Sequence, residues 1–181
     1  GSDNTAFGVN ALAANTTASS NIAFGYLSAS ANTTGTRNVA IGSLAYRNSD
    51  TENDNLAIGY AAMTTNTAGG TRNIAVGNYA LDALTSGDKN TAVGYQALST
   101  NTTAENNTAV GVDALLTCDG SNNTGIGTKS LKLSTTGTQN TAVGHNSLGS
   151  NTTGSGNTTV GSYSLDANTT ADDNTAMGQS T

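Results

Sequence analysis

The stretch Asn90-Thr91-Ala92-Val93-Gly94-Tyr95-Gln96-Ala97-Leu98 decides the fold, because versions of it recur along the whole chain. An asparagine marks the start of each copy, and a glycine stands four residues after it. Successive glycines are 17, 17, 17, 18, 17, 17, 16, 17, 17 and 17 residues apart. They are Gly8, Gly25, Gly42, Gly59, Gly77, Gly94, Gly111, Gly127, Gly144, Gly161 and Gly178. The chain is therefore a repeat protein of about ten and a half 17-residue units.

We number the unit from its asparagine, and it reads N-[T/I/V/L]-A-[V/I/F/M]-G-x-x-[A/S]-L-x-x-N-T-T-x-x-x. The alternation at positions 2 to 4 predicts a short strand between two residues, Asn and Gly, that tolerate left-handed backbone. The apolar pair at positions 8 and 9, such as Ala97-Leu98, predicts a second short strand. The Asn-Thr-Thr segment predicts an exposed loop with a turn held by side chain to backbone hydrogen bonds. One residue is added within 66–72 and one is lost within 117–122, so length varies only in the expected loop.

These patterns predict an all-β fold, a parallel β-solenoid with one coil per unit and coils about 4.7–4.9 Å apart. A pair of helices does not fit into 17 residues, and a glycine in every helix would cost about 1 kcal/mol each. We expect the ladders at positions 4 and 9 to be buried and the asparagines at position 1 to bond coil to coil. The small residues at positions 3 and 8 indicate close approach of backbones.

The solenoid is predicted as a single domain over residues 3–181, with Gly1-Ser2 left from expression cloning. Both ends fall within a unit and lack the polar caps usual in solenoids, so we expect an excerpt of a longer fibre. Each unit also has few large apolar side chains, and the position-2 residues need cover if they do not face the interior of the coil: Ile22, Val39, Leu56 and Ile74. Both features favour association of several chains. We expect a homo-oligomer, a parallel trimer, with a closed cyclic interface.

Composition excludes several classes of protein. Only 10% of the 181 residues are charged and the net charge is −6, without the clustered basic surface that nucleic-acid binding needs. No apolar run approaches the ~20 residues of a membrane span, so we expect no membrane insertion within this segment. A single cysteine, Cys118, cannot form a disulfide within the chain.

The unit resembles the head repeats of trimeric autotransporter adhesins and the related repeats of bacteriophage tail fibres. The resemblance covers Asn4 to Gly178 and is carried by repeats such as Asn90 to Leu98 and Asn38-Val39-Ala40-Ile41-Gly42. It implies a left-handed parallel β-roll, three chains about one axis and a role in attachment. The location it implies is extracellular, on a bacterial surface or a virion tail fibre. This unit is longer than the usual adhesin unit, by its Asn-Thr-Thr loop.

The sequence predicts no enzyme, no cofactor and no metal site. His145 is the only histidine and occupies the variable position 6, which predicts a surface residue and leaves zinc without further ligands. The acidic loop 50–54 lacks the spacing of a calcium-binding loop, and Asp172-Asp173 is a weaker candidate still. Sequons such as Asn101-Thr102-Thr103 recur with the turn, so we interpret them as structural. The ligand-binding residues are not predicted.

Three functions remain open at this point. The first is an attachment segment of an adhesin or tail fibre, with a surface glycan or host-cell receptor as candidate ligand. The second is ice binding, because Thr91, Thr108, Thr124, Thr141, Thr158 and Thr175 form a ladder at position 2. Ile22, Val39, Leu56 and Ile74 interrupt that ladder in coils two to five. The third is a passive stalk without a ligand.

Overall fold

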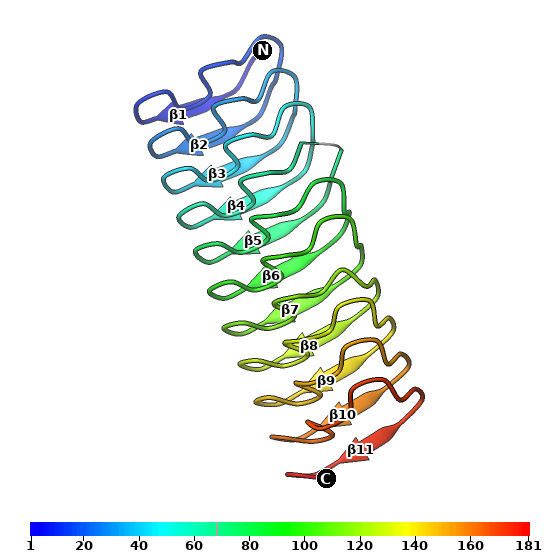
Figure 1. Cartoon of the computed structure of the whole chain (residues 1–181). Helices are drawn as coiled ribbons and strands as arrows, with labels where there is room; N and C mark the ends of the chain where they lie inside the picture. The colour runs from blue at the N-terminus through cyan, green and yellow to red at the C-terminus, as the bar shows by residue number, and fades with distance from the viewer. Residues whose placement is uncertain (68) are drawn as a thin grey trace.

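The computed structural model describes residues 1–67 and 69–181, and these form eleven three-residue strands, one in each full coil and one in the incomplete coil at the C-terminal end. The coils stack in sequence order into a rod with the two termini at opposite ends (Figure 1). The strands are β1 (Thr5–Phe7), β2 (Ile22–Phe24), β3 (Val39–Ile41), β4 (Leu56–Ile58), β5 (Ile74–Val76), β6 (Thr91–Val93), β7 (Thr108–Val110), β8 (Thr124–Ile126), β9 (Thr141–Val143), β10 (Thr158–Val160) and β11 (Thr175–Met177).

All eleven strands join one parallel sheet in the order β1 to β11. The register follows the repeat, so that Thr91 pairs with Thr108 and Val93 with Val110. Where the repeat gains or loses a residue, the register is unchanged, as in the pairing of Leu56 with Ile74. The chain is therefore a parallel β-solenoid with one coil per repeat, as the glycine spacing predicts.

The asparagines at position 1 form the predicted ladder between coils. The Oδ1 atom of Asn90 accepts a hydrogen bond from the backbone N of Asn107, 3.0 Å away in the next coil. Its Nδ2 group donates to the carbonyl of Ala104 at 2.8 Å. Since Asn90 is buried, one side chain satisfies two backbone groups that would otherwise lack partners.

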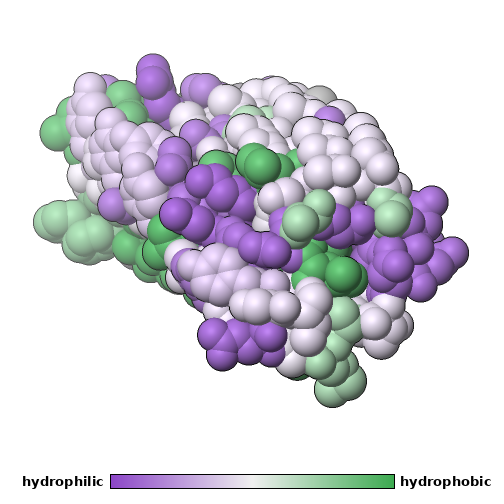
Figure 2. All heavy atoms as spheres, turned by 60° about the horizontal axis from the view of Figure 1, so that its bottom comes forward, coloured by the Kyte–Doolittle hydropathy of each residue, from purple (hydrophilic) through white to green (hydrophobic). Residues whose placement is uncertain are grey.

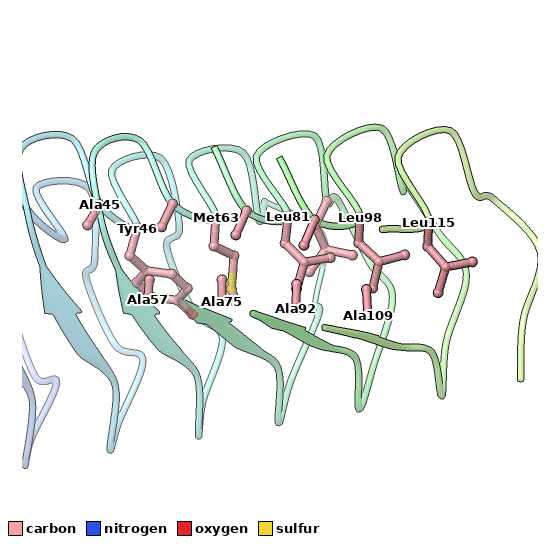
Figure 3. Close-up of a cluster of buried hydrophobic side chains, with 14 of the residues drawn as sticks. Ala45, Tyr46, Ala57, Met63, Ala75, Leu81, Ala92, Leu98, Ala109 and Leu115 are labelled. Carbon is pink, nitrogen blue, oxygen red and sulfur yellow. The ribbon is translucent and has the colours of Figure 1, made fainter. Parts of the chain in front are cut away.

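The interior is built from positions 3 and 9. The alanines of the strands, such as Ala92, are buried, and so are the leucines at position 9, such as Leu98. Figure 3 shows each large side chain from Tyr46 to Leu98 opposite the alanine of the following strand. The prediction of a buried position-9 ladder is confirmed.

The prediction of a buried position-4 ladder is wrong. Val93 is 37% exposed and Phe24 is 52% exposed. Because side chains alternate along a strand, positions 2 and 4 share one face, and alanine at position 3 takes the other. The interior between the strand and the leucine of position 9 has room for only the small side chain. The small residues at positions 3 and 8 thus bring backbones together within a coil and do not form a contact surface between chains.

The predicted second strand is also absent from the described residues. Gln96 and Leu98, at positions 7 and 9, have left-handed backbone with φ of 53° and 52°. Two left-handed residues so close together turn the chain back instead of extending it. The coil therefore closes through a ribbon of turns, with Leu98 directed inward.

The glycine at position 5 has a steric origin. Gly94 has a φ of +142°, a conformation that side chains rarely adopt. A Cβ built on Gly94 would stand 2.4 Å from the carbonyl oxygen of Gly111 in the next coil. Only glycine permits both the turn at the strand's end and the close stacking of coils.

The Asn-Thr-Thr segment is partly buried, whereas the sequence predicts an exposed loop. Asn151 at position 12 is buried, and its Nδ2 group donates to the carbonyl of Gly154 at 2.9 Å. The following residue, Thr152, donates its hydroxyl to the carbonyl of Thr169 in the next coil at 2.9 Å. The asparagine thus holds its own turn, the first threonine joins two coils, and the second, such as Thr153, is exposed.

Candidate binding surfaces

The outer side of the sheet is a regular surface that runs along all eleven strands. We call the outward side chains at positions 2 and 4 the sheet face. Apolar residues (green) reach the surface in several places in Figure 2, among them the side of the rod on the left of the view. At position 4 they are aliphatic or aromatic in every coil: Phe7, Phe24, Ile41, Ile58, Val76, Val93, Val110, Ile126, Val143, Val160 and Met177.

The sheet face changes character along the rod at position 2. In β2 to β5 this position carries Ile22, Val39, Leu56 and Ile74, and Ile22 is 44% exposed. In β6 to β11 it carries the six threonines of the predicted ladder, all of them half-buried or exposed. No strand of the described sheet carries a charged residue. The sheet face is thus wholly apolar from β2 to β5, and it combines threonine with apolar side chains from β6 to β11.

Tyrosines gather on the edge that follows the strands. Five of the six tyrosines occupy positions 6 or 7, just after the glycine turn: Tyr26, Tyr60, Tyr79, Tyr95 and Tyr163. The sixth, Tyr46, is buried at position 9 and accepts a hydrogen bond from Asn55. Sequence reasoning missed this edge, although the clustering of the tyrosines at two positions is visible in the repeat.

Three of these tyrosines form a cluster on successive coils, which we call the tyrosine cluster. The ring of Tyr79 lies edge-on between Tyr60 and Tyr95, with centroids 5.4 and 6.1 Å away. Tyr60 and Tyr95 are 44% and 47% exposed. Partial burial, together with the nearby phenols of Tyr60 and Tyr95, raises the pKa of Tyr79. The cluster therefore presents aromatic surface and phenol hydroxyls to solvent at the same place.

His145 lies exposed on the same edge, as the sequence predicts. Its ring packs edge-on against Tyr163 with centroids 5.1 Å apart, and its Nε2 atom lies 3.2 Å from the phenol oxygen. No group of three or more His, Cys, Asp or Glu side chains that could hold a metal ion occurs in the described part of the chain.

Cys118 is fully buried at position 12, where most other coils carry asparagine. Its thiol donates to the carbonyl of Gly120 at 3.2 Å, which replaces the amide bond that asparagine makes there. Burial raises the pKa of this thiol to about 11. In the same coil, the buried Nδ2 group of Asn107 has no hydrogen-bond partner among the described residues. Burial makes Cys118 unsuited to pairing between chains.

The carboxylates of the acidic loop 50–54 are held by separate partners. Glu52 is buried and accepts hydrogen bonds from the backbone N of Asp50 and of Thr51, at 2.8 and 3.0 Å. Asp54 instead pairs with Arg37, whose Nε lies 2.6 Å away. Arg37 accordingly holds the pKa of Asp54 below its ordinary value.

The second acidic pair, Asp172 and Asp173, is exposed near the C-terminal end. An Oδ1 atom of Asp172 accepts a hydrogen bond from the backbone N of Ser155 at 2.7 Å, which ties it to the neighbouring coil. The sequon asparagines Asn101 and Asn151 are both buried, and Asn151 makes the hydrogen bond that holds its turn.

No pocket is lined by residues 1–67 and 69–181, and no helix among them is long and apolar enough to cross a membrane. Any binding on the described surface therefore uses flat or convex regions. Comparisons of the chain with protein-family models, with curated proteins and with solved structures find no match. The sheet face and the tyrosine edge are the two surfaces on which a function can be argued.

Proposed function

We propose that this β-solenoid is a segment of an extracellular attachment fibre, an adhesin or a phage tail fibre, in which three parallel chains associate through their sheet faces. The observation that carries the proposal is the sheet face itself. It is uncharged over eleven strands and apolar at position 4 in each of them. Contiguous exposed apolar surface of this extent is uncommon on soluble monomers and marks interaction sites.

The energy available from covering this face is sufficient for association. Val110 is 36% exposed, so covering it gains about a third of the free energy of fully burying a valine, or about 0.5–1 kcal/mol. Eleven such side chains in each chain supply roughly 5–10 kcal/mol, before position 2 is counted. This is comparable to the cost of about 4–15 kcal/mol that association imposes. The aliphatic position-2 residues Ile22, Val39, Leu56 and Ile74 add to the favourable side.

A closed parallel assembly fits the geometry of the face. All coils repeat in the same direction, so parallel chains bring equivalent rows of side chains to the same height along a common axis. Cyclic closure covers every sheet face and leaves no open contact surface for further growth. The resemblance of the repeats to those of trimeric adhesin heads and tail fibres supports three as the number of chains.

The test places a charge on the sheet face. Val110→Asp introduces three carboxylates at one level of the trimer, where unpaired charge and mutual repulsion cost several kcal/mol. Thr136→Asp is the matched control, since it adds the same charge at the exposed position 14 of the following coil. Size-exclusion chromatography with light scattering should give a trimer for the control and a monomer for Val110→Asp. Equal masses for the two variants would argue against the sheet face as the interface.

One observation favours ice binding as a second candidate. The threonines of β6 to β11 lie in register beside the aliphatic column of position 4, about 4.8 Å from strand to strand. Flat, regular ladders of threonine occur in ice-binding solenoids. The sheet face cannot be both an interface between chains and a free ice-binding surface. A monomer that shows thermal hysteresis would favour this candidate, whereas a trimer without hysteresis favours the fibre.

A further inference from the structure

We infer that the tyrosine cluster of Tyr60, Tyr79 and Tyr95 is a binding site for a neutral glycan. The inference rests on the proposed function, for which it names the class of ligand. The cluster lies at positions 6 and 7, beyond the ends of the strands, so it remains outside the sheet face that the chains share. It is the largest group of contacting aromatic rings in the described part of the chain.

The rings offer what a sugar ring needs. A pyranose has an apolar face of C–H groups and a rim of hydroxyls. Tyr60 and Tyr95 are nearly half exposed, while Tyr79 between them is held edge-on and half-buried. Tyrosine combines a rigid apolar ring with a hydroxyl that both donates and accepts, so little order is lost on binding.

Polar groups beside the rings complete the site. Asn78 is exposed in the same turn, and its Oδ1 atom accepts a hydrogen bond from the backbone N of Tyr60 at 2.8 Å. That bond fixes the side-chain amide of Asn78, while the Nδ2 group of Asn78 makes no hydrogen bond within the described residues. Asp82 lies close enough to contribute to the raised pKa of Tyr79. Its Oδ1 atom accepts from the hydroxyl of Ser99 at 2.7 Å, and the carboxylate remains half-buried.

The charge around the cluster selects the type of glycan. Asp82 is the ionised group that acts on Tyr79, and the chain as a whole carries a net charge of −6. An acidic glycan would be repelled by this negative charge. The absence of a pocket among the described residues fits an extended chain lying across the rings better than a small enclosed ligand.

The experiment is affinity electrophoresis of the intact protein in native gels that contain mannan, a soluble β-glucan or a galactan. Parallel gels contain alginate as an acidic probe. Neutral polysaccharide should retard the protein, and Tyr60→Ala with Tyr95→Ala should weaken the apparent association about tenfold or more. Tyr26→Ala is the matched control, because Tyr26 is an exposed tyrosine at the same position 6 outside the cluster. Melting temperatures of all variants show whether they are folded.

The outcomes separate this inference from the proposed fibre. Retardation by a neutral polysaccharide that survives Tyr26→Ala and is lost in the double variant supports the site. No retardation by any neutral polysaccharide, retardation by alginate alone, or equal losses in the two variants overturns it. The mass of each sample is measured separately, so a trimer without glycan binding removes only the glycan site, and a monomer removes the trimeric fibre. Because the chain contains no tryptophan, tyrosine fluorescence provides a second readout of binding.

Discussion

Two glycines that lie one coil apart should respond in opposite ways to the same added methyl group. Gly111 at position 5 has a φ of +136°, and a Cβ there would lie 2.6 Å from the carbonyl carbon and oxygen of Gly127. Backbone strain of about 1–3 kcal/mol and overpacking of about 1–3 kcal/mol together predict that Gly111→Ala costs about 2–6 kcal/mol. A chain of this size should then melt roughly 5–20 °C lower.

Gly125 provides the control, because it occupies position 3, where most other coils carry alanine. An added Cβ would stand 3.2 Å from the side chains of Leu115 and Ser130 and 3.3 Å from the backbone oxygen of Ser130, without the positive φ of Gly111. Removing a glycine from a strand gains about 0.5–1 kcal/mol, and small shifts of these side chains use part of it. Gly125→Ala should therefore be neutral or stabilising by up to about 1 kcal/mol.

Both variants are measured by urea unfolding, followed by circular dichroism at one fixed protein concentration, because association contributes to stability. Calorimetric melting accompanies it, since repeat arrays can depart from two-state unfolding. The explanation of the glycine register fails if Gly111→Ala stays within about 0.5 kcal/mol of the parent. It fails equally if Gly125→Ala loses as much stability as Gly111→Ala.

Three further predictions concern the interior. Leu98→Ala should lower the free energy of unfolding in urea by about 2–5 kcal/mol, because Leu98 is buried. Leu133→Ala should lower it by less than about 1 kcal/mol, because the Leu133 side chain is 43% exposed. Equal costs would contradict the position-9 core. Asn90→Ala leaves two buried backbone groups unpaired and should cost about 2–5 kcal/mol in the free energy of unfolding. Asn107→Ala should cost less, because the Nδ2 group of Asn107 has no partner among the described residues to lose. Burial raises the pKa of the Cys118 thiol from 9.0 to about 11. As the pH rises, this thiol therefore ionises in the unfolded chain before it does in the folded chain. The free energy of unfolding should then fall by about 2–3 kcal/mol between pH 9 and 11. Cys118→Ser should lack this loss when unfolding is compared at pH 8 and 10.5, and an identical loss would refute the assignment.

The fold was largely predictable because the repeat determines it. The glycine spacing establishes the stacking of coils, and the asparagine at position 1 predicts a ladder that Asn90 and its neighbours form. The leucine at position 9 was correctly placed in the interior. In each case the same residue type recurs in the same environment, so periodicity alone carries the information.

The sequence wrongly predicts that the position-4 side chains face the interior, whereas the structure places them on the outer side of the sheet, and the reason is physical. Large apolar residues at position 4 suggest a core, yet the interior is too narrow for them and accepts alanine. The threonines at position 2 held the missing signal, because alternation places positions 2 and 4 on one face. A face that carries Thr91 and Thr108 in successive coils is expected to be exposed. The ribbon of left-handed turns at positions 7 and 9 has no comparable signal, since leucine does not favour that conformation.

The candidate surfaces were only partly predictable from sequence. Aliphatic residues at position 2 indicated a face in need of cover, and the structure places them on the sheet face. The tyrosine cluster depends on the packing of side chains from three coils, which the sequence records only as variable positions 6 and 7. The contact between Tyr60 and Tyr79 joins different positions of neighbouring coils, so no single column of the repeat reveals it.

Sedimentation equilibrium of the unaltered protein at micromolar concentration tests the central proposal most directly. The account predicts a single species of three times the chain mass of 17.9 kDa, about 54 kDa, that remains folded on dilution until it dissociates. In the proposed trimer, the apolar sheet face of each chain is covered by the other two chains. A folded species at 17.9 kDa throughout this concentration range would contradict the account, because the sheet face would then be free in solution.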